Sequence, residues 1–201
     1  MLLGDVEDEK PKSKSKSKFS KEDIVSIIKD LVENNGSNSN SNSNLRSIAA
    51  SNKSNQYRMI WAASDNAICY LGSGLHNVPL ARLQEVFISF LKSTIEVHEV
   101  IRLIGPFPNV KNTLKGEISG FTTNTPSIKY TSMIDGTGKE VLAGKQENEK
   151  IVPLDVVLAT ENVIIWKDPN GSGSGSGSEE DFLVFIREYD MTAKLDILRV
   201  L

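Results

Sequence analysis

The sequence is poor in the residues from which most metal and catalytic sites are built. Its 201 residues include one cysteine, Cys69, and two histidines, His76 and His98. A single cysteine cannot form an intramolecular disulfide or a zinc site made of cysteine ligands. The two histidines do not stand in a metal-ligand spacing, and no nucleophile, base and orienting group form a catalytic pattern. We therefore expect no metal, no cofactor and no enzymatic activity.

Strong net charge and long apolar runs are also lacking. The formal net charge is -3 at pH 7, which creates no general field to attract nucleic acid. No apolar run approaches the roughly 20 residues of a membrane-crossing helix, so we expect no transmembrane span. The acidic start between residues 5 and 9 is typical of neither a secretory signal nor a transit peptide. Either the protein has no presequence or the chain begins downstream of one.

Three dipeptide repeats interrupt the sequence: Lys-Ser at 12–18, Ser-Asn at 37–44 and Gly-Ser at 171–178. Such segments have no apolar side chains to bury and are expected to stay flexible and solvated. The Gly-Ser run alone would suggest an engineered linker, but three unlike repeats in one chain favour natural insertions in loops. We predict a disordered Lys/Ser-rich tail at 1–19 and a single domain at 20–201, with low-complexity insertions at 37–44 and 171–178.

Short helices are expected near the start of the domain. Ser20 can cap a first helix, Asp23 completes a weaker form of the capping box, and Gly36 is the stop signal. A second short helix is expected at 45–51. Pro79 suits the first turn of a third helix. The apolar face of that helix would comprise Leu80, Leu83, Val86 and Phe87.

Most of the remaining sequence has the pattern of short strands. Apolar or alternating runs occur at 57–63, 67–71, 93–104, 113–123, 127–134, 156–160, 163–167 and 182–189. Turn-forming residues separate these runs. Strands that follow one another with short turns predict an antiparallel sheet, and closing so many strands into a barrel would remove the sheet's edges. We predict a mainly β protein, an antiparallel barrel with short N-terminal helices.

The run at 93–104 carries an unusual carboxylate. Its residues alternate, so that His98 falls on the polar face and is expected to be exposed to solvent. Glu99 interrupts the apolar face, where an isolated charge would be costly. A strand end, a bulge or an ion pair with Arg187 would account for Glu99. The alternative explanation is a polar anchor inside a ligand-holding barrel.

The loop at 72–79 contains Gly72-Ser-Gly and His76. Backbone N–H groups in such a loop can bind an anion where a helix follows. The full spacing of a phosphate-binding loop with its lysine is absent, and so is the complete dinucleotide-binding pattern. We interpret this segment as a connecting loop.

Residues 57–116 carry a resemblance to a known family. The stretch begins Tyr-Arg-Met-Ile-Trp-Ala-Ala-Ser at Tyr57, continues through a loop, and includes Ile-Glu-Val-His-Glu-Val-Ile-Arg-Leu-Ile-Gly from Ile95. It ends with Pro-Phe-Pro-Asn-Val-Lys-Asn-Thr-Leu-Lys-Gly at Gly116. This order resembles the plastid-lipid-associated (fibrillin) family. The resemblance implies a lipocalin-like β-barrel, a chloroplast or plastid location at plastoglobules or thylakoids, and lipophilic ligands such as prenyl lipids or carotenoids.

The resemblance identifies the family and not the site, but four residues are candidates for contact with a ligand. The segment Phe182–Tyr189 corresponds approximately to the family's closing strand with its arginine. Arg187 would then stack on Trp61 as a cation–π pair at the closed end of the barrel. The candidate ligand-binding residues are Trp61, Glu99, Tyr130 and Arg187.

Three hypotheses for the function follow. The leading one is a protein that binds a lipophilic small molecule or coats a plastoglobule or thylakoid lipid surface. The second is a non-catalytic adaptor that recruits a partner protein in the plastid. The third is an enzyme acting on a lipophilic substrate, with Glu99 or His76 transferring protons.

Overall fold

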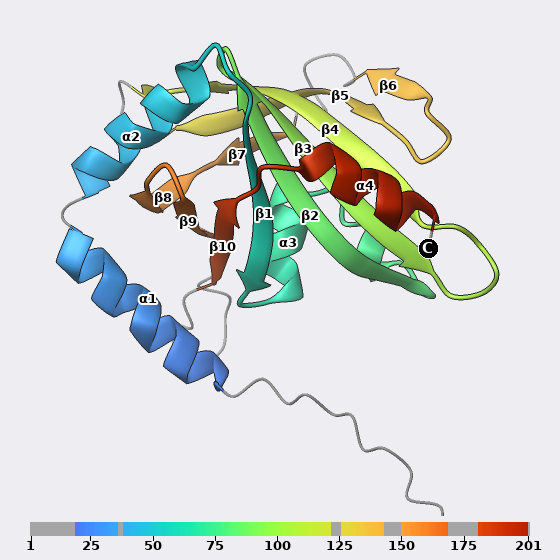
Figure 1. The fold of residues 1–201 in the computed structure, drawn as a ribbon, viewed down its shortest axis with the longest axis horizontal. Helices are drawn as coiled ribbons and strands as arrows, with labels where there is room; N and C mark the ends of the chain where they lie inside the picture. The colour runs from blue at the N-terminus through green and yellow to red at the C-terminus, as the bar shows by residue number, and fades with distance from the viewer. Residues whose placement is uncertain (1–18, 36–37, 122–125, 143–149, 169–180, 201) are drawn as a thin grey trace, which may run out of the picture.

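The computed structural model describes residues 19–35, 38–121, 126–142, 150–168 and 181–200, and its main feature is one curved antiparallel sheet (Figure 1). The strand order is β6-β5-β4-β3-β2-β1-β10-β9-β8, and β7 pairs with β5 beside β6. The Lys-Ser repeat at 12–18 and the Gly-Ser repeat at 171–178 lie outside the described residues, so the predicted domain boundaries stay predictions. The mainly β antiparallel architecture is confirmed.

The strands and helices alternate little along the chain. The strands are β1 (Asn55–Ala62), β2 (Ala81–Leu91), β3 (Thr94–Leu103), β4 (Val110–Ser119), β5 (Ser127–Ile134), β6 (Glu140–Leu142), β7 (Ile151–Pro153), β8 (Asp155–Ala159), β9 (Val163–Lys167) and β10 (Phe182–Arg187). The helices are α1 (Lys21–Asn35), α2 (Asn38–Ala50), α3 (Asp65–Leu71), the 3-10 turn η1 (Leu75–Asn77) and α4 (Met191–Val200). In this part of the chain, none of the helices is long and apolar enough to cross a bilayer.

The sheet is strongly curved but is not closed into a barrel. Within the described residues, β8 forms no ladder with β6 or β7. Only Leu154 separates β7 from β8, so one continuous segment pairs with β5 through its first part and with β9 through its second. The Leu154 amide donates to the Pro126 carbonyl at 2.7 Å and holds this crossing point against the start of β5.

The concave side of the sheet encloses the main core. Aromatic side chains fill a large part of it, with ring centroids 6.0 Å apart for Tyr57 and Phe90, 6.5 Å for Phe90 and Trp166, and 5.0 Å for Trp166 and Phe185. All four side chains are almost completely buried. Leu45 and Ala49 of α2 and three residues of α3 pack into the same core. Aromatic pairs of this kind add to the stabilisation that burial of apolar area provides.

Two helices cover the convex side. Ile28 of α1 packs with Leu158, Ile165 and Phe182 on the outer face of β8, β9 and β10. On the other part of the sheet, Met191 and Leu195 of α4 pack with Phe87 and Val100 of β2 and β3. Figure 1 shows α4 lying across these strands and α1 to the side of β9 and β10. Because of α4, β2 and β3 are buried on both faces.

From Asn38 onward the Ser-Asn repeat belongs to a helix and not to a loop, contrary to the sequence-based expectation. The helix at 45–51 is confirmed, but α2 already begins at Asn38. Ser41 is 3% exposed, and its hydroxyl donates to the Val157 carbonyl at 3.2 Å. The Asn44 side-chain amide donates to the Ala159 carbonyl at 3.0 Å. The small polar side chains of the repeat therefore bind carbonyls of β8, the edge strand, which would otherwise be open to pairing with another chain.

Replacement of Ser41 with alanine should lower the free energy of unfolding by about 1 kcal/mol, because it leaves a buried carbonyl without its donor. Ser47→Ala is the matched control, since the exposed Ser47 hydroxyl bonds only the Ser43 carbonyl of its own helix. Urea denaturation of both variants measures the difference. Equal stability of the two variants would show that the contact with β8 contributes nothing.

Two predicted elements are wrong. Residues 67–71 form part of the helix α3 and not a strand, because the Ser64 hydroxyl caps its N-terminus by accepting from the Ala67 amide at 3.2 Å. The segment after Pro79 forms β2 and not a helix. Its neighbours Val86 and Phe87 point to opposite faces, and both are buried since α4 covers the outer face. Burial on both sides removed the alternation that identifies a strand.

At the two ends of the domain, the N-terminal capping box was predicted and the C-terminal helix was not. The capping box of α1 is confirmed: the Ser20 amide donates to Asp23 Oδ2 at 2.9 Å, and the Asp23 amide donates to Ser20 Oγ at 3.1 Å. The C-terminal helix α4 was not predicted. Its apolar residues Met191, Leu195 and Leu198 have helical spacing and provided a usable signal.

Candidate functional site

The loop between α3 and β2 is held in place by the buried carboxylate of Glu99. Glu99 lies on the concave face of β3 and is completely buried. Its Oε1 accepts from the Ser73 amide at 2.9 Å, and its Oε2 accepts from the Ser73 hydroxyl. Glu99 therefore anchors the protein's own loop, which is none of the explanations left open by the sequence. Among the described residues, Glu99 forms no ion pair with Arg187, which was one of the alternatives.

Gly72 makes room for this carboxylate. A Cβ atom at residue 72 would lie 1.9 Å from Glu99 Oε1, far inside the sum of the van der Waals radii. The next glycine, Gly74, has a φ of 73°, which allows the chain to turn into η1. The Gly72-Ser-Gly sequence is thus required by close packing and backbone geometry, and the interpretation as a structured connection is confirmed.

Two more polar side chains, those of Lys150 and Tyr130, bind backbone carbonyls at the end of α3 and the start of the loop. The Lys150 ammonium donates to the Cys69 carbonyl at 3.2 Å and to the Gly72 carbonyl, and it lies 5.6 Å from the centroid of the Tyr130 ring. The Tyr130 hydroxyl donates to the Leu71 carbonyl at 2.6 Å. Burial lowers the pKa of Lys150, while Glu99 acts in the opposite direction. Burial first, and then the nearby Glu99 carboxylate, raise the pKa of Tyr130, so the phenol stays protonated.

A cleft of about 400 Å³ opens between this loop and the sheet. Its apolar walls come from the loop, β4 and β5, and its polar residues are Ser73, Asn112 and Lys150. The apolar lining residues are Leu75, Val78, Leu114 and Met133. Mostly apolar walls with a few convergent polar groups are typical of small-molecule sites.

Cys69, His76 and Asn77 form a second polar group next to the loop. The Cys69 sulfur lies 3.6 Å from His76 Nε2 and accepts from the Asn77 side-chain amide at 2.9 Å. Burial is the main cause that raises the pKa of the Cys69 thiol. A thiol kept protonated is a poor nucleophile. This arrangement therefore resembles a loop-stabilising contact more than an activated nucleophile.

The structure brings together two of the four predicted ligand-binding residues. Glu99 and Tyr130 both lie on the concave face behind the cleft, where the Glu99 carboxylate affects the pKa of Tyr130. Glu99 acts through Ser73, and Tyr130 acts through Leu71. Both support the wall of the cleft and do not line it.

Trp61 lies on the opposite face of the sheet from the cleft. A β-bulge interrupts the pairing of β1 with β10 between Met59, opposite Phe185, and Trp61, opposite Val184. The extra residue reverses the alternation, so Met59 points into the main core whereas Trp61 packs under α1. Trp61 therefore cannot contact a ligand in the cleft.

Arg187 also lies away from the cleft, and its predicted stacking on Trp61 is wrong. Arg187 stands opposite Tyr57 in the ladder, with its guanidinium carbon 5.2 Å from the Tyr57 ring centroid and 5.7 Å from that of Tyr189. It donates to Asn55 Oδ1 at 2.8 Å. A cation–π contact exists as expected, but with different aromatic partners.

His98 is buried and not exposed as expected. It lies on the convex face of β3, where α4 and the neighbouring strands exclude solvent, and it is 6% exposed. Its Nδ1 lies 3.0 Å from the Thr113 hydroxyl. Burial is the main cause that lowers the pKa of His98 to about 4, and Lys111 contributes in the same direction.

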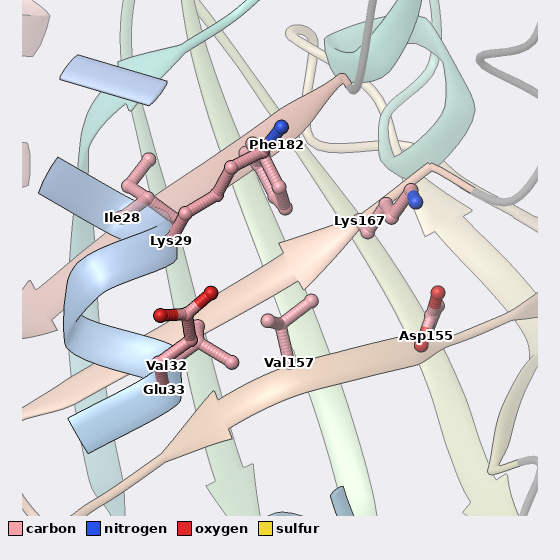
Figure 2. A pocket seen from close by; sticks show the side chains of 8 residues that line it. All are labelled: Ile28, Lys29, Val32, Glu33, Asp155, Val157, Lys167 and Phe182. Carbon is pink, nitrogen blue, oxygen red and sulfur yellow. The ribbon is translucent and has the colours of Figure 1, made fainter. Parts of the chain in front are cut away.

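Two other clefts are less suited to a buried ligand. Figure 2 shows a groove of about 320 Å³ between α1 and the strands β8 to β10, with Ile28, Val32, Val157 and Phe182 along its apolar part. Lys29, Glu33, Asp155 and Lys167 bring charges of both signs to its edges. A larger cleft of about 580 Å³ lies where β1 and β2 separate. There Arg58 is paired with Glu85 at 3.7 Å and with Glu188 at 3.8 Å.

Comparisons with known proteins identify no relative. No protein-family model, no curated protein and no solved structure matches the chain.

Neither Asn112 nor Lys150 was predicted as a site residue. Asn112 lies on the concave face opposite Glu99, within a strand that alternation had predicted only in part. Lys150 directly precedes β7, which was not predicted at all. A usable signal for Asn112 was its position among apolar residues of the same face, Leu114 and Ile118.

Proposed function

We propose that the protein is a non-catalytic, plastid-lipid-associated protein of the fibrillin type, which binds a lipophilic small molecule. The observation that carries this proposal is the cleft of about 400 Å³ beside the Glu99-anchored loop. Its apolar walls can bury the body of such a ligand, and the burial of apolar area supplies the main driving force. The plastid location and the prenyl-lipid or carotenoid class follow from the resemblance of residues 57–116.

We propose further that the sheet serves as a lipocalin-like barrel. The support is its strong curvature and the continuous segment β7–β8, which joins both outer parts of the sheet through the chain. Aromatic rings occupy much of the enclosed space, so the ligand would enter at the side of the 72–78 loop and not pass through the interior.

A specific observation also supports contact with a lipid surface. Ile24, Ile28 and Val32 of α1 pack against the sheet, whereas Ile27 and Leu31 are 47% and 43% exposed. Phe19, just before the helix, is 56% exposed. An exposed apolar stripe on a helix suits the boundary between lipid and water.

Mass spectrometry of lipids that co-purify with the protein from a plastid extract separates these possibilities. An enriched prenyl lipid or carotenoid at a fixed ratio to protein would support binding in the cleft. A lipid-free protein that floats with lipid droplets would favour surface contact through α1. A protein that neither retains lipid nor floats would contradict the proposed function.

Replacement of Val78 with tryptophan should reduce the co-purified lipid at least about tenfold, because the larger side chain fills the mouth of the cleft. Val78 lines the cleft and is 49% exposed, so the free protein should tolerate the change. Ile197→Trp is the control, since Ile197 is an exposed residue of α4 outside the cleft. An equal loss of lipid in both variants would argue against this cleft.

A further inference from the structure

Asn112 presents an unused amide to the cleft. It is only 3% exposed and stands opposite Glu99 in the ladder between β3 and β4. No residue in the described ranges forms a hydrogen bond with its side chain, although it lines the cleft. Its amide atoms stay open to the cleft, since neither of them is among the polar side-chain atoms that are fully buried without a partner. Asn112 can therefore donate to a polar atom of a ligand in the cleft.

Lys150 provides a second donor to the same space. Its ammonium group gives hydrogen bonds to two carbonyl groups, those of Cys69 and Gly72. An ammonium group has three N–H donors, and these two carbonyls therefore leave one N–H for another acceptor. Because Lys150 also lines the cleft, the polar end of the site is rich in donors. The ligand atom that fits there is a hydrogen-bond acceptor.

The charges around the site favour a neutral acceptor. Glu99 accepts from Ser73, which lines the cleft, and Lys150 donates to the carbonyl of the preceding residue, Gly72, so the two charged groups bind adjacent residues of the loop. The carboxylate offsets the positive charge of Lys150 and would repel an anionic head group. A carbonyl oxygen satisfies the donors without introducing a second negative charge into a buried site.

We propose that the cleft selects lipophilic molecules by a neutral carbonyl group, whose oxygen accepts hydrogen bonds from Asn112 Nδ2 and Lys150 Nζ. The apolar body of the ligand lies along Leu75, Val78, Leu114 and Met133. This inference rests on the lipophile binding proposed above and adds the chemical class of the head group. Asn112 is then a specificity-determining residue.

Three probes of equal chain length test the head group on the full chain: 2-dodecanone labelled with ¹³C at the carbonyl, dodecane and dodecanoate. The ketone should bind at least about tenfold more tightly than either of the others, because only the ketone pairs both donors without adding charge. The ¹³C resonance of the bound carbonyl should move downfield relative to the ketone in an alkane solvent. Asn112→Leu should bring the affinity for the ketone close to that for dodecane and remove most of the shift.

Each alternative outcome contradicts a different statement. Equal binding of ketone and dodecane, or an unshifted carbonyl resonance in the wild-type protein, would overturn the head-group inference and leave lipophile binding intact. Tighter binding of dodecanoate would replace the neutral site with an anion site. Failure of all three probes to bind would overturn the proposed function itself. The wild-type measurements decide these cases even if Asn112→Leu does not fold.

Discussion

Replacement of Gly72 with alanine should lower the free energy of unfolding by about 3 kcal/mol, the upper part of the range for overpacking a buried site. The added methyl group would lie 1.9 Å from Glu99 Oε1 and 3.2 Å from the Ile68 carbonyl oxygen. The backbone of Gly72 has a φ of -93°, which alanine adopts without strain, so the cost comes from the collision alone. Either Glu99 turns away and loses Ser73, or the loop shifts and the cleft changes shape.

Urea denaturation measures this effect against Gly138→Ala. Gly138 has a φ of 82°, but an added methyl group would meet nothing within 4 Å. Its substitution therefore carries only the backbone cost of about 1 kcal/mol. A Gly72→Ala variant no less stable than Gly138→Ala would contradict the close approach of Glu99.

A double-mutant comparison identifies Glu99 as the partner in the collision. Glu99→Gln alone should destabilise the protein by about 2 kcal/mol, because its amide group cannot accept from both donors of Ser73. In the Gly72→Ala background the same change should cost much less, since the anchor is already disturbed. Additive effects would show that the two residues act independently.

The sheet was largely predictable from the sequence because most of its strands form alternating or compact apolar runs bounded by turn residues. Alternating or compact apolar runs identified β5 and β9 at their observed bounds and β3, β4, β8 and β10 approximately. The segment that became β2 lacks this signal, since α4 covers its outer face. The burial of Phe87 depends on that distant helix, so no local pattern could have revealed it.

The candidate site was only partly predictable. Glu99 was detectable because a carboxylate on an apolar face demands an explanation, and its partner Ser73 was in a loop already noted for its glycines. Trp61 shows the opposite case, in which one bulge reverses the face of every following residue. Lys150 reaches Cys69 across 81 positions of sequence, and contacts of this length follow from the topology of the sheet alone.

Acidification should destabilise the protein because His98 is buried in its neutral form. The pKa of His98 is lowered from 6.5 to about 4 in the folded state. Between these two values the unfolded chain binds a proton that the folded chain does not, so stability is complete above pH 6.5 and declines as the pH falls. The loss attributable to His98 should approach about 3 kcal/mol near pH 4, at 1.36 kcal/mol for each unit of pKa shift.

The surroundings of His98 explain why burial prevails over the nearby carboxylate. Glu96 Oε2 lies 3.5 Å from His98 Nε2, but the Glu96 side chain is 41% exposed, so solvent weakens its attraction for a protonated imidazole. Lys111 adds repulsion from the neighbouring strand. Desolvation of the charged ring is therefore the decisive contribution.

Comparison of the wild-type protein with His98→Gln isolates this contribution from the titration of the carboxylates. Glutamine keeps a neutral polar group that can pair with the Thr113 hydroxyl, and it does not titrate. Unfolding free energies measured between pH 4 and pH 7 should fall more steeply for the wild-type protein, and the two curves should run parallel above pH 7. Parallel curves over the whole range would mean that protonation of His98 is not opposed in the folded state, and that α4 does not seal this face of the sheet.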